Sequence, residues 1–201
     1  MSIELDGFDI LKPESYARML KYDVIVNCVG FTKGHMLKDE NINLNYRAVI
    51  GLVAWCNKHK KKYVHISTDI VYAGTQCNAL ETDVPVHAAN WYAYSKLLAD
   101  GYVQAVCNDY LLIRTAFKPR PFPYKKVFLK FGNFDYVDVI AELIIDLMGK
   151  NACGVYNVGT KTKSMWEHAR ETVPDIETAD SIPVDVTMNL EKMKGLLCAK
   201  E

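Results

Sequence analysis

The fold is decided by two short apolar runs, Val24–Cys28 (VIVNC) and Tyr63–Ile66 (YVHI), with a helical segment between them. A continuous apolar run that ends in a polar residue, with Gly30 just beyond, is typical of a parallel strand buried on both faces. From Asn43 to His59, apolar residues recur at the spacing of an α-helix. A strand, a helix and a second strand in this order predict a βαβ unit.

The same alternation continues through the rest of the chain. It predicts a helix over 92–107, a strand over 110–113, a helix that begins at the pair Asp135 and Asp138 and ends at Gly149, and a strand over 155–158. We therefore expect an α/β fold with a mostly parallel, Rossmann-like sheet and flanking helices. The proline-rich stretch Phe117–Lys126 divides a dinucleotide-binding part, 1–116, from a mixed part with a small substrate lobe, 117–201.

Composition excludes several classes of function. The chain has 201 residues with Lys+Arg and Asp+Glu balanced at 24 each, which favours neither a nucleic-acid nor an anionic-membrane partner. No apolar run is long enough to span a bilayer, and the N-terminus has no signal-peptide pattern. The six cysteines include no Cys-x-x-Cys pair, so we expect free buried thiols in the cytoplasm and no metal site.

Polar residues follow three of the predicted strands. They are Asn27–Gly30, Ser67–Asp69 and the pair Arg114 and Thr115. Ligands of parallel α/β sheets bind outside the carboxyl ends of the strands. These three clusters therefore define a candidate site. The cations of the loop 118–126 could bind a diphosphate. A loop that is simply exposed to solvent would account for these cations equally well.

Tyr92 and Lys96 are the sharpest chemical feature of the sequence. Residues four apart share a helix face, so the phenol would lie beside the ammonium, and a nearby positive charge lowers the pKa of a tyrosine. Tyr92 would then be a usable acid or base. A lone Tyr-x-x-x-Lys is usually a surface pair, and a strand-end hydroxyl such as Thr68 is usually a cap. Their occurrence together favours a functional site.

The chain resembles the extended short-chain dehydrogenases, and within them the dTDP-4-dehydrorhamnose reductase family. The resemblance is carried by 64–74 (VHISTDIVYAG), 91–97 (WYAYSKL) and 23–28 (DVIVNC), with later landmarks at 112–115 and 154–159. It implies NAD(P)H-dependent reduction of a 4-keto nucleotide sugar, as in dTDP-rhamnose biosynthesis.

The resemblance also implies roles for single residues. Thr68, Tyr92 and Lys96 would be catalytic: Tyr92 would protonate the sugar carbonyl oxygen, Lys96 would tune Tyr92 and hold the nicotinamide ribose, and Thr68 would align the carbonyl. The backbone at Cys28, Val29 and Gly30 would pass beside an NADP or NAD cofactor, together with Tyr92 and Lys96. The residues expected to contact the nucleotide-sugar substrate are Ser67, Asp69, Arg114 and Arg120.

One part of the family pattern is missing from this sequence. None of the eleven glycines forms the Gly-x-x-Gly-x-x-Gly turn that cradles the dinucleotide phosphates. We therefore expect a truncated Rossmann-like sheet with weak cofactor binding. A non-catalytic sugar-nucleotide-binding or protein-interaction module is the alternative function. The strand Val24–Cys28 would lie at an edge, covered by Ile3–Leu5, by a second copy of the chain, or by a completing partner chain.

Overall fold

The computed structural model describes residues 8–32, 34–85, 88 and 90–199. The fold-back segment Ile3–Leu5 lies outside these residues. The chain forms two compact units: 1–67 with 88–112, and 68–87 with 113–201. These units differ from the expected division into 1–116 and 117–201, which concerns cofactor and substrate roles and stays a prediction.

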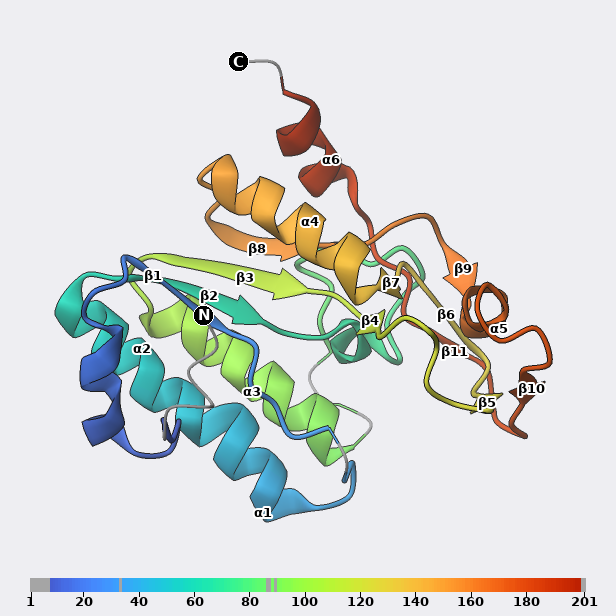
Figure 1. The fold of residues 1–201 in the computed structure, drawn as a ribbon, viewed down its shortest axis with the longest axis horizontal. Coiled ribbons are helices and arrows are strands. Elements are labelled where there is room, and N and C mark those ends of the chain that lie inside the picture. Colours follow the sequence, from blue (N-terminus) through green and yellow to red (C-terminus); the bar gives the residue numbers. More distant parts are fainter. Residues whose placement is uncertain (1–7, 33, 86–87, 89, 200–201) are drawn as a thin grey trace. The chain divides into compact units, whose positions relative to one another are not determined.

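The first unit alternates helices and strands, as the sequence predicts (Figure 1). Its elements are the 3-10 helix η2 (Pro13–Met19), strand β1 (Val24–Asn27), helix α1 (Lys38–Asn41), the π-helix η3 (Ile42–Arg47), helix α2 (Ala48–His59), strand β2 (Lys62–Ile66), helix α3 (Trp91–Val106) and the first part of β3 (Tyr110–Arg114). The predicted strands and helices of this region are thus confirmed. The helix expected from Asn43 begins earlier, at α1, and passes through one π-helical segment.

The second unit carries the end of β3 and a set of short strands. Its elements are the 3-10 helix η4 (Asp69–Tyr72), strands β4 (Phe117–Lys118), β5 (Lys126–Val127), β6 (Lys130–Gly132) and β7 (Asp135–Tyr136), helix α4 (Val137–Gly149), strands β8 (Gly154–Asn157) and β9 (Lys163–Ser164), helix α5 (Met165–Arg170), strands β10 (Glu177–Thr178) and β11 (Val184–Asp185), and helix α6 (Glu191–Cys198). Three small sheets form here, with the orders β10-β5, β11-β6-β9 and β4-β7.

The main sheet has the strand order β1-β2-β3-β8. Strands β1 and β2 run parallel, with Val26 opposite Val64 and Asn27 opposite His65. Helices α2 and α3 pack against each other in the first unit, and α6 packs on β8 in the second. The predicted α/β fold with a parallel sheet and flanking helices is therefore confirmed. No helix in the described part of the chain is long and apolar enough to cross a membrane.

Strand β1 differs from the prediction of a strand buried on both faces. Ile25 and Asn27 are buried, whereas Val24 and Val26 are 38% and 44% exposed. Alternate side chains of a strand point to opposite faces, so one face of β1 is covered and the other is open. Among the described residues, β1 pairs with β2 alone and lies at the edge of the sheet.

Two local expectations were wrong. Helix α4 begins after Tyr136 without a side-chain cap, because the N-cap position is Tyr136 and Asp135 lies one residue before it. The Asp135 carboxylate binds Lys163, Thr160 and the Tyr136 N–H. The helix does end at Gly149, as predicted. All six cysteines are free, but only Cys56 and Cys107 are buried; the other four are exposed.

Candidate functional site

Lys96 is held inside the first unit. Its side chain lies on α3, which begins where the Asn90 side chain caps it by accepting from the Ala93 N–H at 2.9 Å. The Lys96 ammonium donates to the Ile66 carbonyl at the end of β2, at 2.7 Å, and the residue is 3% exposed. Burial lowers the pKa of Lys96 to about 8, while the nearby Asp100 and then Cys28 act in the opposite direction. The amine is thus fixed at the carboxyl end of a strand.

Tyr92 lies one turn before Lys96 on α3. The two residues are four apart and share a helix face, as the sequence predicts. The Tyr92 ring is half-buried and lies edge-on to the His35 ring, with 5.4 Å between the centroids. The backbone of Trp91 donates to the His35 carbonyl at 3.1 Å, so the loop before α1 is tied to the start of α3.

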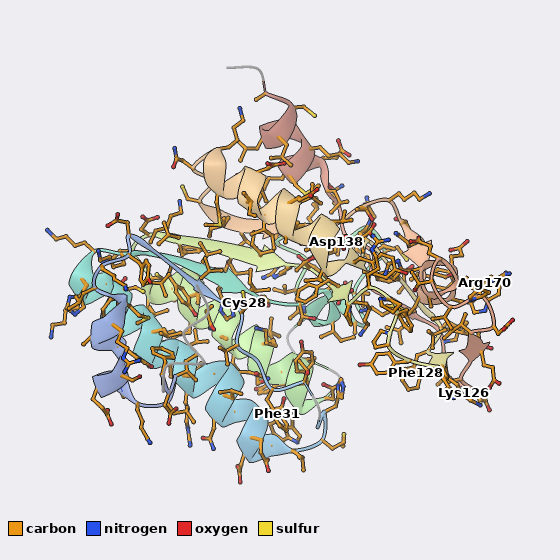
Figure 2. The ribbon with its side chains drawn as sticks, viewed as in Figure 1. Cys28, Phe31, Lys126, Phe128, Asp138 and Arg170 are labelled. Carbon is orange, nitrogen blue, oxygen red and sulfur yellow. The ribbon has the colours of Figure 1, made fainter. Side chains whose placement is uncertain are left out.

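The turn after β1 is fixed by Asn27 and Asn45. Asn27 Oδ1 accepts from the Val29 N–H at 3.0 Å, and Asn45 Oδ1 accepts from the Phe31 N–H at 2.6 Å. Cys28 follows β1 directly and is exposed (Figure 2). Desolvation raises the pKa of the Cys28 thiol and the Lys96 ammonium opposes this, which places the two groups in each other's neighbourhood. A Cβ added at Gly30 would meet only Asn45 Oδ1, at 3.5 Å.

Ser67 directly follows β2 and has a buried hydroxyl. The residue is 6% exposed, and its Oγ has no hydrogen-bond partner among the described residues. A buried hydroxyl without a partner costs about 1–3 kcal/mol. The predicted contact of Ser67 with the substrate stays a prediction.

In the second unit, Thr68 and Asp69 have contacts within the chain. Thr68 Oγ1 caps η4 by accepting from the Ile70 N–H at 3.3 Å. Asp69 is 1% exposed and forms an ion pair with Lys130, at 2.7 Å. Capping a helix or turn is the structural role that a hydroxyl at the end of a strand usually has. A catalytic role of Thr68 and a substrate role of Asp69 stay predictions.

The two arginines expected to bind substrate differ in exposure. Arg114 is 1% exposed and donates to the Tyr72 hydroxyl at 2.8 Å and to the Glu81 carbonyl at 2.7 Å. Arg120 is half exposed, lies 4.0 Å from the Tyr136 ring centroid and pairs with Asp138 at 3.4 Å. Arg114 thus has a structural function in the second unit, and its predicted contact with substrate stays a prediction.

Lys118 was expected only as one cation of a loop. In the structure it belongs to β4, and burial together with the neighbouring Lys130 lowers its pKa, while Asp69 opposes them. Asp69, which pairs with Lys130, therefore also acts electrostatically on Lys118. No sequence signal could have separated Lys118 from the other loop cations, because the separation depends on burial.

Sequence reasoning missed the residues behind Lys96. His65 and Asp100 are fully buried, and the imidazole Nε2 lies 3.5 Å from the Lys96 amine and 3.9 Å from Asp100 Oδ1. The spacing of Lys96 and Asp100, four residues on one helix, was available as a signal. Asn45 was missed as well; its amide donates to the Ser95 hydroxyl and the Phe31 carbonyl, both at 3.1 Å.

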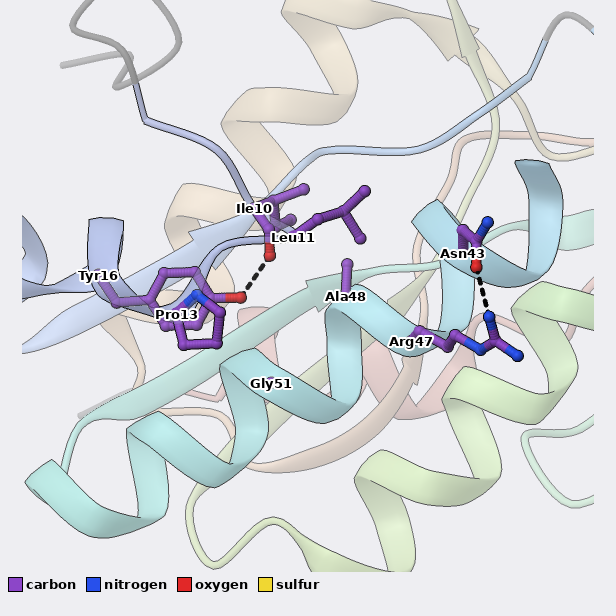
Figure 3. Close-up of a pocket in the computed structure, with 8 residues that line it drawn as sticks. All are labelled: Ile10, Leu11, Pro13, Tyr16, Asn43, Arg47, Ala48 and Gly51. Carbon is purple, nitrogen blue, oxygen red and sulfur yellow. Dashed lines mark hydrogen bonds between the residues drawn. The ribbon is translucent and has the colours of Figure 1, made fainter. Parts of the chain in front are cut away.

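A cavity of about 420 Å³ lies elsewhere in the first unit (Figure 3). None of the predicted site residues lines it. Its polar groups are Arg47, whose guanidinium donates to Asn43 Oδ1 at 2.8 Å, and the Tyr16 hydroxyl, which donates to the Ile10 carbonyl. The remaining lining residues are Leu11, Pro13, Ala48 and Gly51. The described residues include no cluster of three or more His, Cys, Asp or Glu side chains able to hold a metal ion.

Comparison with known proteins supports the class that the fold indicates. A hypothetical dTDP-4-dehydrorhamnose reductase from Sulfolobus tokodaii superposes with a TM-score of 0.81 at 23% identity, over 96% of this chain and 81% of that one. The dTDP-4-dehydrorhamnose reductase of Bacillus anthracis, in complex with NADP, gives 0.77 at 18% identity, over 94% and 80%. At these identities the likeness shows the fold alone: the chain is an α/β protein with a Rossmann-type parallel sheet.

The sequence comparison identifies the family. The model of the RmlD substrate binding domain matches residues 2–118, and the chain belongs to that family. A dTDP-4-dehydrorhamnose reductase from Burkholderia thailandensis is 34% identical over 117 residues, which are 55% of this chain and 39% of that protein. The chain spans about two fifths of the length of the curated relatives it matches.

Proposed function

We propose that the chain carries the Tyr–Lys centre of an NAD(P)H-dependent reductase that acts on a 4-keto nucleotide sugar. The observation that carries the proposal is the Lys96 amine, buried on α3 and bound to the carbonyl at the end of β2, one helical turn after Tyr92. Membership of the RmlD substrate-binding family supports the substrate class.

In this proposal Tyr92 is the general acid. It donates its phenolic proton to the C4 carbonyl oxygen of the sugar. A nicotinamide cofactor, when bound, would supply the hydride that the carbonyl carbon requires. The Lys96 ammonium stabilises the phenolate that remains and so makes the proton transfer easier. Thr68 aligns the carbonyl oxygen, and Ser67 contacts the substrate.

Mutation of Tyr92 tests this assignment. Reduction of dTDP-4-dehydrorhamnose is measured at millimolar NADPH and NADH. Loss of a general acid typically costs about 10²- to 10⁴-fold in rate, so Tyr92→Phe should lose turnover on that scale. Tyr94→Phe, which alters the next tyrosine of the same helix, is the matched control. Equal rates in the two variants, or no binding of the nucleotide sugar by calorimetry, would contradict the proposed function.

The residues present fit the nicotinamide end of a dinucleotide. Lys96 offers a donor, and the turn Cys28–Gly30 offers an exposed backbone with room beside Gly30. No glycine-rich phosphate loop occurs in the sequence. Losing two or three charge-assisted hydrogen bonds of about 1.5–3 kcal/mol each weakens binding by several orders of magnitude. We therefore expect weak or undetectable binding of NADP(H) or NAD(H) by this chain alone.

Calorimetry on the full chain checks the expectation for the cofactor. Millimolar or unmeasurable affinity for NADPH is the expected result. Micromolar affinity would contradict it and would indicate a replacement phosphate site within 118–126. The variant Lys118→Met, at the end of β4, is the first to measure.

We also propose that β1 pairs with a second copy of the chain or with a completing partner chain, and we favour the homodimer. The open face of β1 presents Val24 and Val26, and the strand lies at the sheet edge among the described residues. An unprotected apolar edge favours association with another chain.

Light scattering at micromolar concentration should show a dimer, and Val26→Glu should reduce it to monomer. A monomeric wild type with protected β1 amides in hydrogen exchange would contradict the dimer.

A further inference from the structure

A network of buried polar groups surrounds the Lys96 amine in the first unit. Its members are Asn27, Tyr63, His65, Lys96 and Asp100, none more than 4% exposed. The Asn27 amide donates to the Tyr63 oxygen at 2.9 Å, and that oxygen lies 3.2 Å from His65 Nδ1. On the other side of the ring, Nε2 lies 3.5 Å from the Lys96 amine and 3.9 Å from Asp100 Oδ1. Strand β1, strand β2 and helix α3 each contribute to it.

The charges within this set of buried polar groups have to balance. A buried ammonium is costly unless an opposite charge compensates it. The Ile66 carbonyl, 2.7 Å from the Lys96 amine, and the His65 ring, 3.5 Å from it, carry no negative charge. Burial and the neighbouring Lys96 hold the pKa of His65 well below its usual range, so the ring is neutral. The remaining titratable groups that act on Lys96 are Asp100, from its own helix, and Cys28, after β1.

We propose that Asp100 is the buried counter-charge that keeps Lys96 an ammonium, acting across the neutral His65 ring. Asp100 and His65 are then positioning residues for the Tyr92–Lys96 pair, and in this sense the inference rests on the proposed function. Asp100 lies one turn after Lys96 on the same face of α3, and its carboxylate approaches the same ring nitrogen as the amine.

The hydrogen bonds continue from His65 toward the turn after β1. His65 Nδ1 and the Tyr63 hydroxyl lie 3.2 Å apart, and which of them donates follows the tautomer of the ring. The Tyr63 oxygen also accepts from the Asn27 amide. Asn27 Oδ1 in turn accepts from the Val29 N–H, at 3.0 Å. One buried network therefore joins Lys96 to the turn Cys28–Gly30, the two parts of the predicted cofactor site.

Nuclear magnetic resonance on the full chain tests the counter-charge without any substrate. The Lys96 Cε resonance is titrated in the wild type and in Asp100→Asn. An opposite charge at this range shifts a pKa by about 1–3, so the variant should lower the pKa of Lys96 by that amount. Asp100→Glu should restore it. Asp23→Asn, which removes a carboxylate that is 98% exposed, should leave it unchanged. An unchanged Lys96 pKa in Asp100→Asn overturns the proposal.

If Asp100→Asn does not fold, a titration of the wild-type chain tests the counter-charge instead. The Asp100 Cγ and His65 Nε2 resonances should then move together with the midpoint of the Lys96 titration, and flat resonances across that midpoint overturn the proposal. The outcome is separate from that of the proposed function. A coupled titration without reductase turnover would refute the enzyme assignment alone, and turnover without coupling would refute the counter-charge alone.

Discussion

Among single residues, Thr68 has a role that can be measured directly. Its hydroxyl accepts from the Ile70 N–H and so caps η4, and the residue is 7% exposed. Thr68 is also the predicted aligning group for the substrate carbonyl. The two roles differ in what they require: a cap needs only a short side-chain oxygen, whereas alignment needs that oxygen at one position relative to the substrate.

Mutation of Thr68 separates the two roles. Thr68→Ala should lower the free energy of unfolding by about 1 kcal/mol through loss of the cap. Thr68→Ser should keep most of it. The free energy is measured by urea denaturation of each variant. A Thr68→Ala protein as stable as the wild type would contradict the capping role, and a Thr68→Ser protein with full stability but reduced turnover would support alignment of the substrate.

At the scale of elements, the ion pair of Asp69 and Lys130 joins η4 to β6. Asp69 is 1% exposed and the Lys130 side chain 20%, and the ammonium lies within 2.9 Å of both carboxylate oxygens. The turn that follows the predicted Ser67–Thr68 segment is therefore held by a strand about sixty residues later in the chain. Burying such an ion pair costs desolvation energy. Removing one partner leaves an unpaired buried charge, which destabilises the fold more than replacing both partners.

Removal of Lys130 should destabilise the second unit. Lys130→Met leaves the Asp69 carboxylate buried, and we expect a loss of about 3 kcal/mol, reduced by the nearby Lys118. The double variant Asp69→Asn, Lys130→Met should recover part of it. Thermal unfolding of the wild type, the single variants and the double variant gives the coupling energy. If the two single effects simply add up in the double variant, the two groups do not interact as described.

At the scale of the whole molecule, two buried histidines make stability depend on pH. Burial lowers the pKa of His65 and of His168. Lys163 lowers that of His168 further, while Glu171 and Asp135 oppose this. Both rings are neutral in the folded protein and gain a proton near pH 6.5 when unfolded. Their contribution to stability is therefore full above about pH 6.5 and is lost as the pH falls below it.

We expect the melting temperature to fall between pH 7 and pH 5. Each histidine contributes at most about 1.4 kcal/mol per pH unit. The His168 ring packs among Phe122, Phe134 and Tyr136, and neither ring nitrogen has a hydrogen-bond partner among the described residues. His168→Phe should therefore be tolerated and should flatten the pH dependence. His59→Gln, at a half-buried position of α2, is the control. An equal slope in wild type and His168→Phe would contradict this prediction.

The sequence by itself determined the order of the elements and the spacing of the Tyr–Lys pair. The strand predicted at Tyr63–Ile66 is β2 (Lys62–Ile66), and the helix predicted over 92–107 is α3 (Trp91–Val106). Both follow from local sequence: a short continuous apolar run predicts the strand, and the alternation of helices with strands predicts the helix. The shared face of Tyr92 and Lys96 follows from the spacing of the pair. The cap expected at Asp135 is absent because α4 has Tyr136 at its N-cap position, one residue later.

Only the tertiary structure decided what each polar side chain contacts and which apolar side chains are covered. Lys96 binds the Ile66 carbonyl 30 residues away in the chain, and Arg114 binds Tyr72 at a separation of 42. Such contacts depend on which segments pack together, and local periodicity carries no information about them. The exposure of Val24 and Val26 has the same origin: the alternation of a strand is written in the sequence, but the burial of each face is set by what lies against it.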